Sequence, residues 1–177
     1  MTRLPWLRRI SQTLPLFKTV GRGCLHAINL ACILHLFKEN IGSPCFSYGP
    51  SMLPTLETEG EVLIESIITH RLAPLARGEI VSLKSPYDPN KFICKRVIGL
   101  PGDIVCVDPT GLAAPSMEHV VVPKGHVWIA GDNLALSTDS RDYGPVAMAL
   151  IRGRIVARIF PFSRFKLFRP EATYIDD

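Results

Sequence analysis

Short apolar runs, cut by proline and glycine, fill the chain after Asn40 and limit what it can fold into. The runs are EVLIESIIT, GEIVSLKSP, FICKRVIGLPGD, IVCVDPTG, EHVVVPKGHVWIAGD and IRGRIVARIFPF. They are rich in Val and Ile and are bounded by turn residues, whereas no long helical period is visible among them. The pattern therefore predicts a mostly β domain of several short strands over residues 43–177.

The N-terminal segment has a different charge from the rest of the chain. Residues 1–38 contain six basic residues and no acid, whereas the remaining residues hold 14 basic residues against 16 acidic ones. Residues 1–22, rich in Arg, Ser and Thr, are typical of a mitochondrial targeting segment rather than a secretory signal, because no small-residue cleavage site follows. The slight acidic excess elsewhere disfavours a nucleic-acid-binding surface, so we expect no nucleic-acid partner.

Residues 23–40 are predicted to form a membrane-anchoring helix. Their apolar core, residues 24–37, is 14 residues long and contains His26, Asn29 and His35. A comfortable membrane span needs roughly 20 apolar residues, so a buried helix and an amphipathic surface anchor remain as alternatives. If the segment spans the membrane, the preceding basic residues favour an N-terminus on the matrix side.

The cysteines do not form a metal-binding or disulfide pattern. Five are present, an odd number, and no two are spaced as a CxxC pair. This spacing disfavours a zinc site and a dense disulfide framework, so we expect no metal and no cofactor. A single bridge, for example between Cys94 and Cys106, stays open, and buried thiols acting as small hydrophobic groups are the favoured interpretation.

Ser51 in the stretch GPSMLPT is a candidate nucleophile, although Gly-Pro-Ser is also an ordinary turn. A nucleophilic serine needs a base, and the usual base is histidine. None of the three histidines outside the N-terminal segment lies in a recognisable triad setting; they are His70, His119 and His126. A histidine base is therefore disfavoured.

Lys95 is a better candidate for the base. In the run FICKRVI, the two-residue period of a strand places Ile93, Lys95 and Val97 on one face. A lysine between two aliphatic neighbours loses hydration, and this lowers its pKa, as a general base near neutral pH requires. The alternative is a lysine that extends to solvent. Arg96 points to the other face and keeps its proton, so it cannot replace Lys95.

Four ordered blocks carry a resemblance to a known family. They are SMLPTL at residues 51–56, KRVIGLPGD at 95–103, VPKGHVWIAGDN at 122–133 and STDSRDYGPV at 137–146. Together they resemble the type I signal peptidase family, whose members cut presequences with a serine/lysine dyad. The resemblance covers nearly all of the chain after Phe46, and it implies a compact β domain tethered by an N-terminal membrane helix.

The resemblance also implies roles for individual residues. Ser51 matches the nucleophile, Lys95 the general base, and Ser137 a serine that orients the lysine. Asp139 and Arg141 match an ion pair that supports the loop carrying Ser137. Gly49 is a departure, because bacterial members often carry an oxyanion-stabilising hydroxyl there; the backbone N–H of Ser51 and a second donor would have to replace it.

Within that family, the chain resembles a eukaryotic branch, the mitochondrial inner membrane peptidase. The short interval between residues 103 and 131, Gly49 and the acid-free N-terminus carry this resemblance, and residues 150–161 are closer to subunit 1 than to subunit 2. It implies a heterodimer with a sister subunit, a catalytic domain facing the intermembrane space, and precursor proteins with cleavable presequences as substrates.

Two other functional classes compete with the peptidase. The first is a catalytically silent scaffold subunit, which the presence of Ser51, Lys95 and Ser137 together disfavours. The second is a self-cleaving transcriptional repressor, which uses a similar dyad on a related fold. The absence of a helix-turn-helix pattern and of a basic face in the folded part disfavours the repressor.

Overall fold

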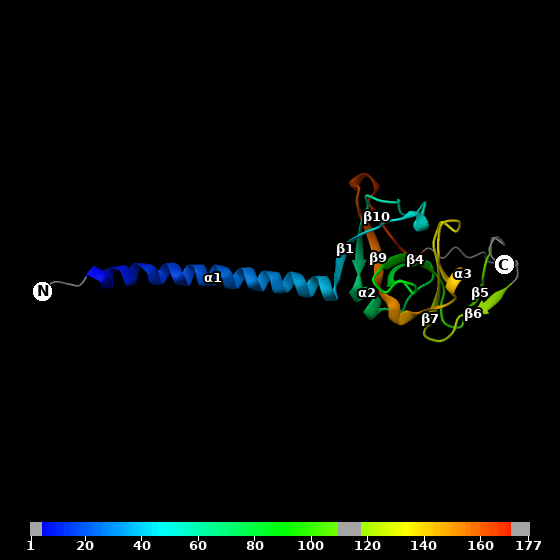
Figure 1. The fold of residues 1–177 in the computed structure, drawn as a ribbon, viewed down its shortest axis with the longest axis horizontal. Coiled ribbons are helices and arrows are strands. Elements are labelled where there is room, and N and C mark those ends of the chain that lie inside the picture. Colours follow the sequence, from blue (N-terminus) through cyan, green and yellow to red (C-terminus); the bar gives the residue numbers. More distant parts are fainter. Residues whose placement is uncertain (1–4, 110–117, 171–177) are drawn as a thin grey trace. The chain divides into compact units, whose positions relative to one another are not determined.

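The structure, a computed structural model, describes residues 5–109 and 118–170. The chain forms two compact units, residues 1–39 and 40–177. The described part of the first unit lies in one continuous helix, α1 (Pro5–Asn40) (Figure 1). It begins well before residue 23, so most of the basic segment expected to precede the helix is part of it. Within the described residues, no helix contains a stretch that is both long and apolar enough to cross a membrane.

The second unit is built on antiparallel strands, which confirms the prediction of a mostly β domain. The main sheet has the order β1-β2-β9-β3-β4-β7-β8, with β10 on β9, and β5 pairs with β6 in a separate small sheet. The strands are β1 (Gly42–Phe46), β2 (Val62–Ser66), β3 (Ile80–Lys84), β4 (Phe92–Gly99), β5 (Ile104–Cys106), β6 (His119–Val121), β7 (His126–Ala130), β8 (Val146–Ala147), β9 (Ile151–Phe160) and β10 (Lys166–Leu167).

Short helical turns connect these strands. They are the 3-10 turns η1 (Pro50–Met52), η2 (Met148–Leu150) and η3 (Phe162–Arg164), and the helices α2 (Ile67–Leu72) and α3 (Ser140–Tyr143). Helix α2 makes the last three residues of the run EVLIESIIT helical rather than extended. Ser66 ends β2 and caps α2, because its side-chain oxygen accepts the N–H of Thr69 at 3.4 Å.

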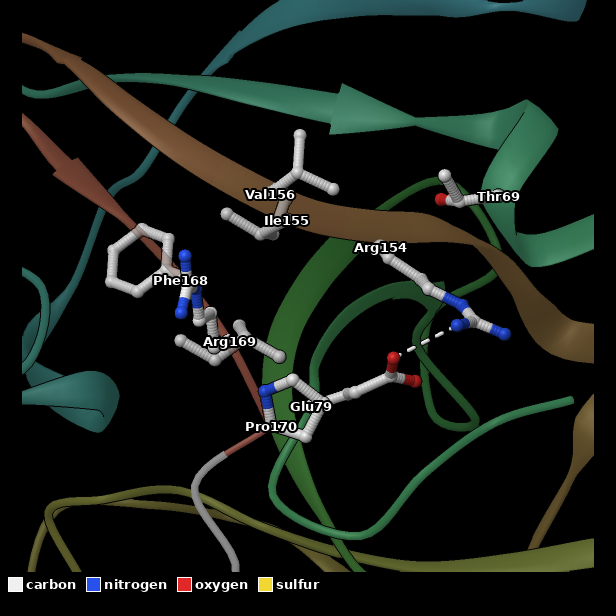
Figure 2. A pocket seen from close by; sticks show the side chains of 9 residues that line it. Thr69, Glu79, Arg154, Ile155, Val156, Phe168, Arg169 and Pro170 are labelled. Carbon is white, nitrogen blue, oxygen red and sulfur yellow. Dashed lines mark hydrogen bonds and ion pairs between the residues drawn. The ribbon is translucent and has the colours of Figure 1, made fainter. Parts of the chain in front are cut away.

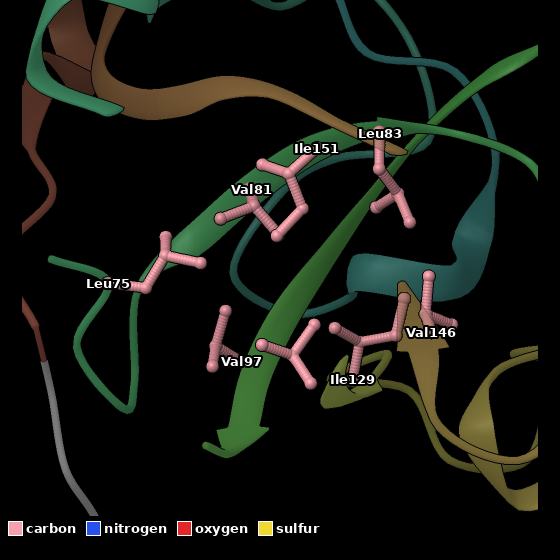
Figure 3. Packing of buried hydrophobic residues seen from close by; sticks show 8 residues of the cluster. Leu75, Val81, Leu83, Val97, Ile129, Val146 and Ile151 are labelled. Carbon is pink, nitrogen blue, oxygen red and sulfur yellow. The ribbon is translucent and has the colours of Figure 1, made fainter. Parts of the chain in front are cut away.

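The centre of the sheet is covered on both faces. On β3, Val81 and Leu83 belong to one core cluster and Ile80 to another, as neighbouring residues of a strand point to opposite faces. Figure 3 shows the first cluster, which consists of Leu75, Val81, Leu83, Val97, Val127, Ile129, Val146 and Ile151. On the neighbouring strand β4, a polar side chain that faces this cluster, such as that of Lys95, is consequently buried.

Candidate active site

Lys95 lies in the middle of β4, on the face that packs against the first core cluster. Ile93 and Val97 contact or belong to that cluster, and Val81 is the cross-strand partner of Lys95 on β3. Only 3% of Lys95 is exposed, so the strand phase predicted from the sequence is the one observed. Burial lowers the pKa of the Lys95 amine, although the Asp139 carboxylate acts in the opposite direction.

Ser137 lies between Lys95 and a carboxylate. The amine of Lys95 donates to Ser137 Oγ at 2.8 Å, and Ser137 Oγ donates to Asp139 Oδ2 at 2.7 Å. Because the hydroxyl hydrogen is directed at Asp139, Ser137 offers only a lone pair to Lys95. A neutral Lys95 therefore donates an N–H to Ser137, and the lone pair of its amine stays available to accept a proton from another group.

Asp139 is the buried centre of the loop that carries Ser137. Its side chain is fully buried, and it accepts hydrogen bonds from Arg141 Nε at 2.9 Å and from the Gly131 N–H at 2.8 Å. Burial alone would raise the pKa of Asp139, but the hydrogen bonds from Arg141, Gly131 and Ser137 outweigh it and lower that pKa. Arg141 also donates to the carbonyl of Leu134 at 2.8 Å, which closes the loop.

The turn that carries Ser51 lies against the same loop. The N–H of Asn133 donates to the Ser51 carbonyl at 3.0 Å. Gly131 lies between the two serines, since a Cβ at Gly131 would be 2.4 Å from the Ser51 carbonyl oxygen and 2.2 Å from Ser137 Oγ. The fold thus brings the turn of Ser51 to the group formed by Lys95, Ser137, Asp139 and Arg141.

The Ser51 side chain and backbone amide both remain available. Among the hydrogen bonds of the described residues, none involves the Ser51 hydroxyl, to Lys95 or to any other group, and none uses the Ser51 N–H. The N–H of Gly49, by contrast, already donates to the Thr58 carbonyl at 2.7 Å. The Ser51 N–H can therefore donate to a developing oxyanion, whereas that of Gly49 cannot without breaking this turn.

Gly49 is required by the backbone of the turn. Its φ is +105°, in the region that favours glycine. A side chain at this position would be strained even though no atom lies within 4 Å of the place it would occupy. Gly49 thus lacks the hydroxyl that bacterial members often carry at this position, and its backbone conformation is one that favours glycine.

A cavity of about 90 Å³ opens beside Ser51. It lies between the turn and the first half of β4, and its lining residues are Phe46, Ser47, Tyr48, Gly49, Ser51, Met52, Phe92, Ile93 and Cys94. Strand β7 pairs with β4 only from Arg96 onward. Within the described residues, the start of β4 therefore has a free edge on the β7 side, to which an extended peptide can add as a strand.

Comparisons with known proteins identify the family of this chain. A family model described as "Signal peptidase, peptidase S26" matches residues 21–114 and 108–160. The chain belongs to this peptidase family. The mitochondrial inner membrane protease subunit 1 of Homo sapiens is 45% identical over 154 residues, which cover 86% of this chain and 88% of that protein. Its namesake from Xenopus tropicalis is 47% identical over 141 residues, covering 79% and 82%.

Relatives in the peptidase family also support the similarity to subunit 1. The mitochondrial ATP-independent inner membrane protease subunit 1a of Arabidopsis thaliana is 42% identical over 138 residues, covering 78% of this chain and 82% of that protein. A mitochondrial inner membrane protease subunit 2, from Danio rerio, is 37% identical over 126 residues, covering 69% and 66%. The expected resemblance to the subunit 1 type is confirmed.

Arg96 makes contacts beside this group of residues that sequence reasoning missed. Its Nε and one terminal nitrogen donate to the two carboxylate oxygens of Asp132 at 2.8 and 2.7 Å, and its other terminal nitrogen donates to the Gly78 carbonyl at 2.7 Å. Asp132 precedes Asn133, whose N–H holds the Ser51 carbonyl. Arg96 thus links the strand of Lys95 to the loop that holds Ser51. The sequence signal that could have revealed this role is an arginine on a strand face, which needs an acidic partner. Asp132 is such an acid, and it lies in the block VPKGHVWIAGDN at residues 122–133.

Replacing Arg96 with lysine is expected to reduce kcat up to about 100-fold, because a lysine cannot make the two parallel hydrogen bonds to Asp132 and small displacements at a reacting centre are costly. Steady-state kinetics on a peptide spanning a cleavage junction measures this effect. Arg164→Lys is the matched control, since Arg164 is a half-exposed arginine paired with Glu57. Equal kcat values for Arg96→Lys and wild type would contradict a positioning role for Arg96.

A second cavity, of about 150 Å³, lies apart from these residues (Figure 2). At its rim, Arg154 pairs with Glu79 at 2.8 Å and donates to the carbonyls of Ala73 and Pro74. None of Ser51, Lys95 and Ser137 lines it. The hydrogen bonds hold residues 73–74 against β9, and the ion pair holds Glu79 there, which is a structural role.

Proposed function

We propose that this member of the signal peptidase family is a serine endopeptidase in which Ser51 is the nucleophile and Lys95 the general base. The observation that carries the proposal is a lysine that is only 3% exposed, has a lowered pKa and is 2.8 Å from a serine that is itself bonded to a buried carboxylate. A lysine that stabilised the fold through an ion pair would instead be expected to lie directly against an acid.

In the proposed reaction, neutral Lys95 takes the proton of the Ser51 hydroxyl while Oγ attacks the scissile carbonyl carbon. The Ser51 N–H stabilises the resulting oxyanion. Protonated Lys95 then gives its proton to the leaving amine, and an acyl-enzyme remains on Ser51. Lys95 next takes a proton from a water molecule, whose oxygen attacks the ester carbonyl carbon. As the bond from that carbon to Ser51 Oγ breaks, Lys95 returns the proton to Oγ, which releases the second product and regenerates the Ser51 hydroxyl. Throughout, Ser137 Oγ accepts an N–H of the Lys95 amine, and Asp139 holds Ser137 in place.

The substrates we propose are precursor proteins with cleavable presequences, bound as an extended strand along the free edge of β4. The names of the relatives support a location at the mitochondrial inner membrane and a heterodimer with a sister subunit. The acid-free, basic residues 1–38 support membrane association through the N-terminal segment. We also propose that residues 43–177 face the intermembrane space, where presequences would be removed.

The remaining alternative is a catalytically silent scaffold subunit. Such a protein needs the fold but has no need for a buried lysine, and burying an amine that has no ion-pair partner costs stability. The complete group of Ser51, Lys95 and Ser137 therefore favours an active enzyme.

A processing assay tests the proposed function. The full chain, assembled with a sister subunit whose own nucleophile is replaced, is incubated with precursors that carry a cleavable presequence. We expect the wild-type chain to release a product with a defined new N-terminus and Ser51→Ala to release none. Full processing by Ser51→Ala would refute the nucleophile assignment, and absence of processing by both proteins would favour the scaffold.

A further inference from the structure

The guanidinium group of Arg152, on β9, lies over the ring of Phe92. Its central carbon is 5.1 Å from the ring centroid, a distance at which cation–π attraction operates. Phe92 begins β4 and lines the cavity beside Ser51. Half of Phe92 is exposed, so contacts with other strands do little to fix the ring. Arg152 is thus in a position to hold one wall of that cavity.

Arg152 is itself held by a buried carboxylate. Its Nε is 3.5 Å from Glu65 Oε2, and Glu65 is only 2% exposed. The other oxygen of Glu65 accepts the hydroxyl of Ser82. Glu65 cannot move away from Arg152 without leaving a buried charge unpaired, which is costly. The position of the guanidinium is therefore fixed from the interior of the sheet.

A glycine makes this arrangement feasible. Glu65 lies on β2 and Ser82 on β3, with β9 between them in the sheet. Gly153 of β9 leaves the space that Glu65 needs, because a Cβ there would be 2.8 Å from Glu65 Cγ. The contacts consequently run across the sheet, from Glu65 through Arg152 to Phe92 at the start of β4.

We propose that Arg152 is a positioning residue for substrate binding, which holds Phe92 as an apolar wall of the cavity beside Ser51. The ligand class is an apolar side chain of an extended substrate. This inference rests on the proposed function and extends it, because it assigns a specificity role to two residues outside the group around Lys95.

The position of Phe92 determines which kinetic constant it affects. Phe92 lies three residues from Lys95, roughly 10 Å along an extended strand. The Phe92 ring takes no part in proton transfer or nucleophilic attack, so a substrate side chain that packs on it makes a binding contact only. Contacts of that kind are made equally in the ground state and the transition state, so their loss raises KM and leaves kcat unchanged.

A double-mutant cycle tests the proposal. The full chain, with its sister subunit inactivated, is assayed with a peptide that spans a precursor cleavage junction and carries an apolar residue near the cut. Arg152→Gln and Phe92→Leu are each expected to raise KM about three- to fivefold, in line with one exposed cation–π contact, with kcat within about twofold. The double variant is expected to be no worse than Phe92→Leu alone. Arg164→Gln, at an ion pair whose two residues do not line the cavity, is the control.

The other outcomes would overturn the proposal. If Arg152→Gln raises KM equally in the Phe92→Leu background, Arg152 contacts substrate directly. If it lowers kcat alone, or changes neither constant, it does not act through the cavity wall. If Arg152→Gln unfolds because Glu65 is left unpaired, the cycle is run with Arg152→Lys, which keeps a charge there and is expected to raise KM by a smaller factor that again depends on Phe92. Failure of the wild-type chain to cleave would instead refute the proposed function.

Discussion

Replacing Lys95 with methionine is expected to lower kcat by a factor of about 10² to 10⁴, the usual contribution of a positioned general base. Methionine has a similar length and suits the apolar surroundings of Lys95, namely Ile93, Val97 and Val81. Ser137 keeps its hydrogen bond to Asp139 in the variant. We therefore expect the fold to persist, with an unfolding temperature no lower than that of wild type, so that the loss is one of chemistry.

A matched substitution separates this effect from a general loss of charge. Lys84 lies at the exposed end of β3, the strand that pairs with β4. Lys84→Met removes one lysine from the same sheet and is expected to leave kcat unchanged. A Lys95→Met variant that keeps more than about a tenth of the wild-type kcat would show that Lys95 is not the base.

The pH dependence of the wild-type enzyme follows from the same burial. Lys95 accepts a proton only when neutral, so kcat/KM is expected to rise as pH increases through its pKa and to be lost as pH falls. Because burial lowers that pKa, the midpoint of the rise should lie below the ordinary lysine value of 10.5. Measuring kcat/KM across this range checks the sign, and a profile that falls with increasing pH there would contradict the role of Lys95.

The features of this site that could be predicted from the sequence are those that depend on local patterns, such as the two-residue period of a strand. A strand alternates its side chains, so Ile93 and Val97 already indicated an apolar environment for Lys95. The turn with a single serine was likewise visible in the sequence. Helix α2 was not, since the apolar pattern of EVLIESIIT suits a short strand or a short helix, and the cap supplied by Ser66 decides between them.

The contacts between distant segments could not be predicted in the same way. Arg96 and Asp132 are 36 residues apart, and their pairing depends on the register of β4 with β7. The contact of Arg152 with Phe92 requires β3 to lie between β9 and β4. Periodicity says which face a residue occupies, whereas strand order and register say which residues meet on it.

Replacing Gly131 with alanine is expected to have a large effect on kcat. The new methyl carbon would be 2.2 Å from Ser137 Oγ and 2.4 Å from the Ser51 carbonyl oxygen, so at least one serine must move. Both neighbours are held, Ser137 by Lys95 and Asp139, and the Ser51 carbonyl by Asn133. A displacement of about 1 Å at a reacting centre can cost roughly 100-fold, and we expect kcat to fall by at least that factor.

The steric overlap of the new methyl group would also lower the free energy of unfolding, by about 2 kcal/mol. Replacing a second glycine, Gly99, is the control for this effect. Gly99 packs in another core cluster, where a Cβ would be 2.7 Å from Val105 Cγ1 and 3.2 Å from a side-chain atom of Trp128. Gly99→Ala should lower the unfolding free energy by a similar amount while the folded fraction keeps its kcat. If both variants lost stability and kept kcat, Ser51 and Ser137 would tolerate separation, and the geometry around Gly131 would have no part in catalysis.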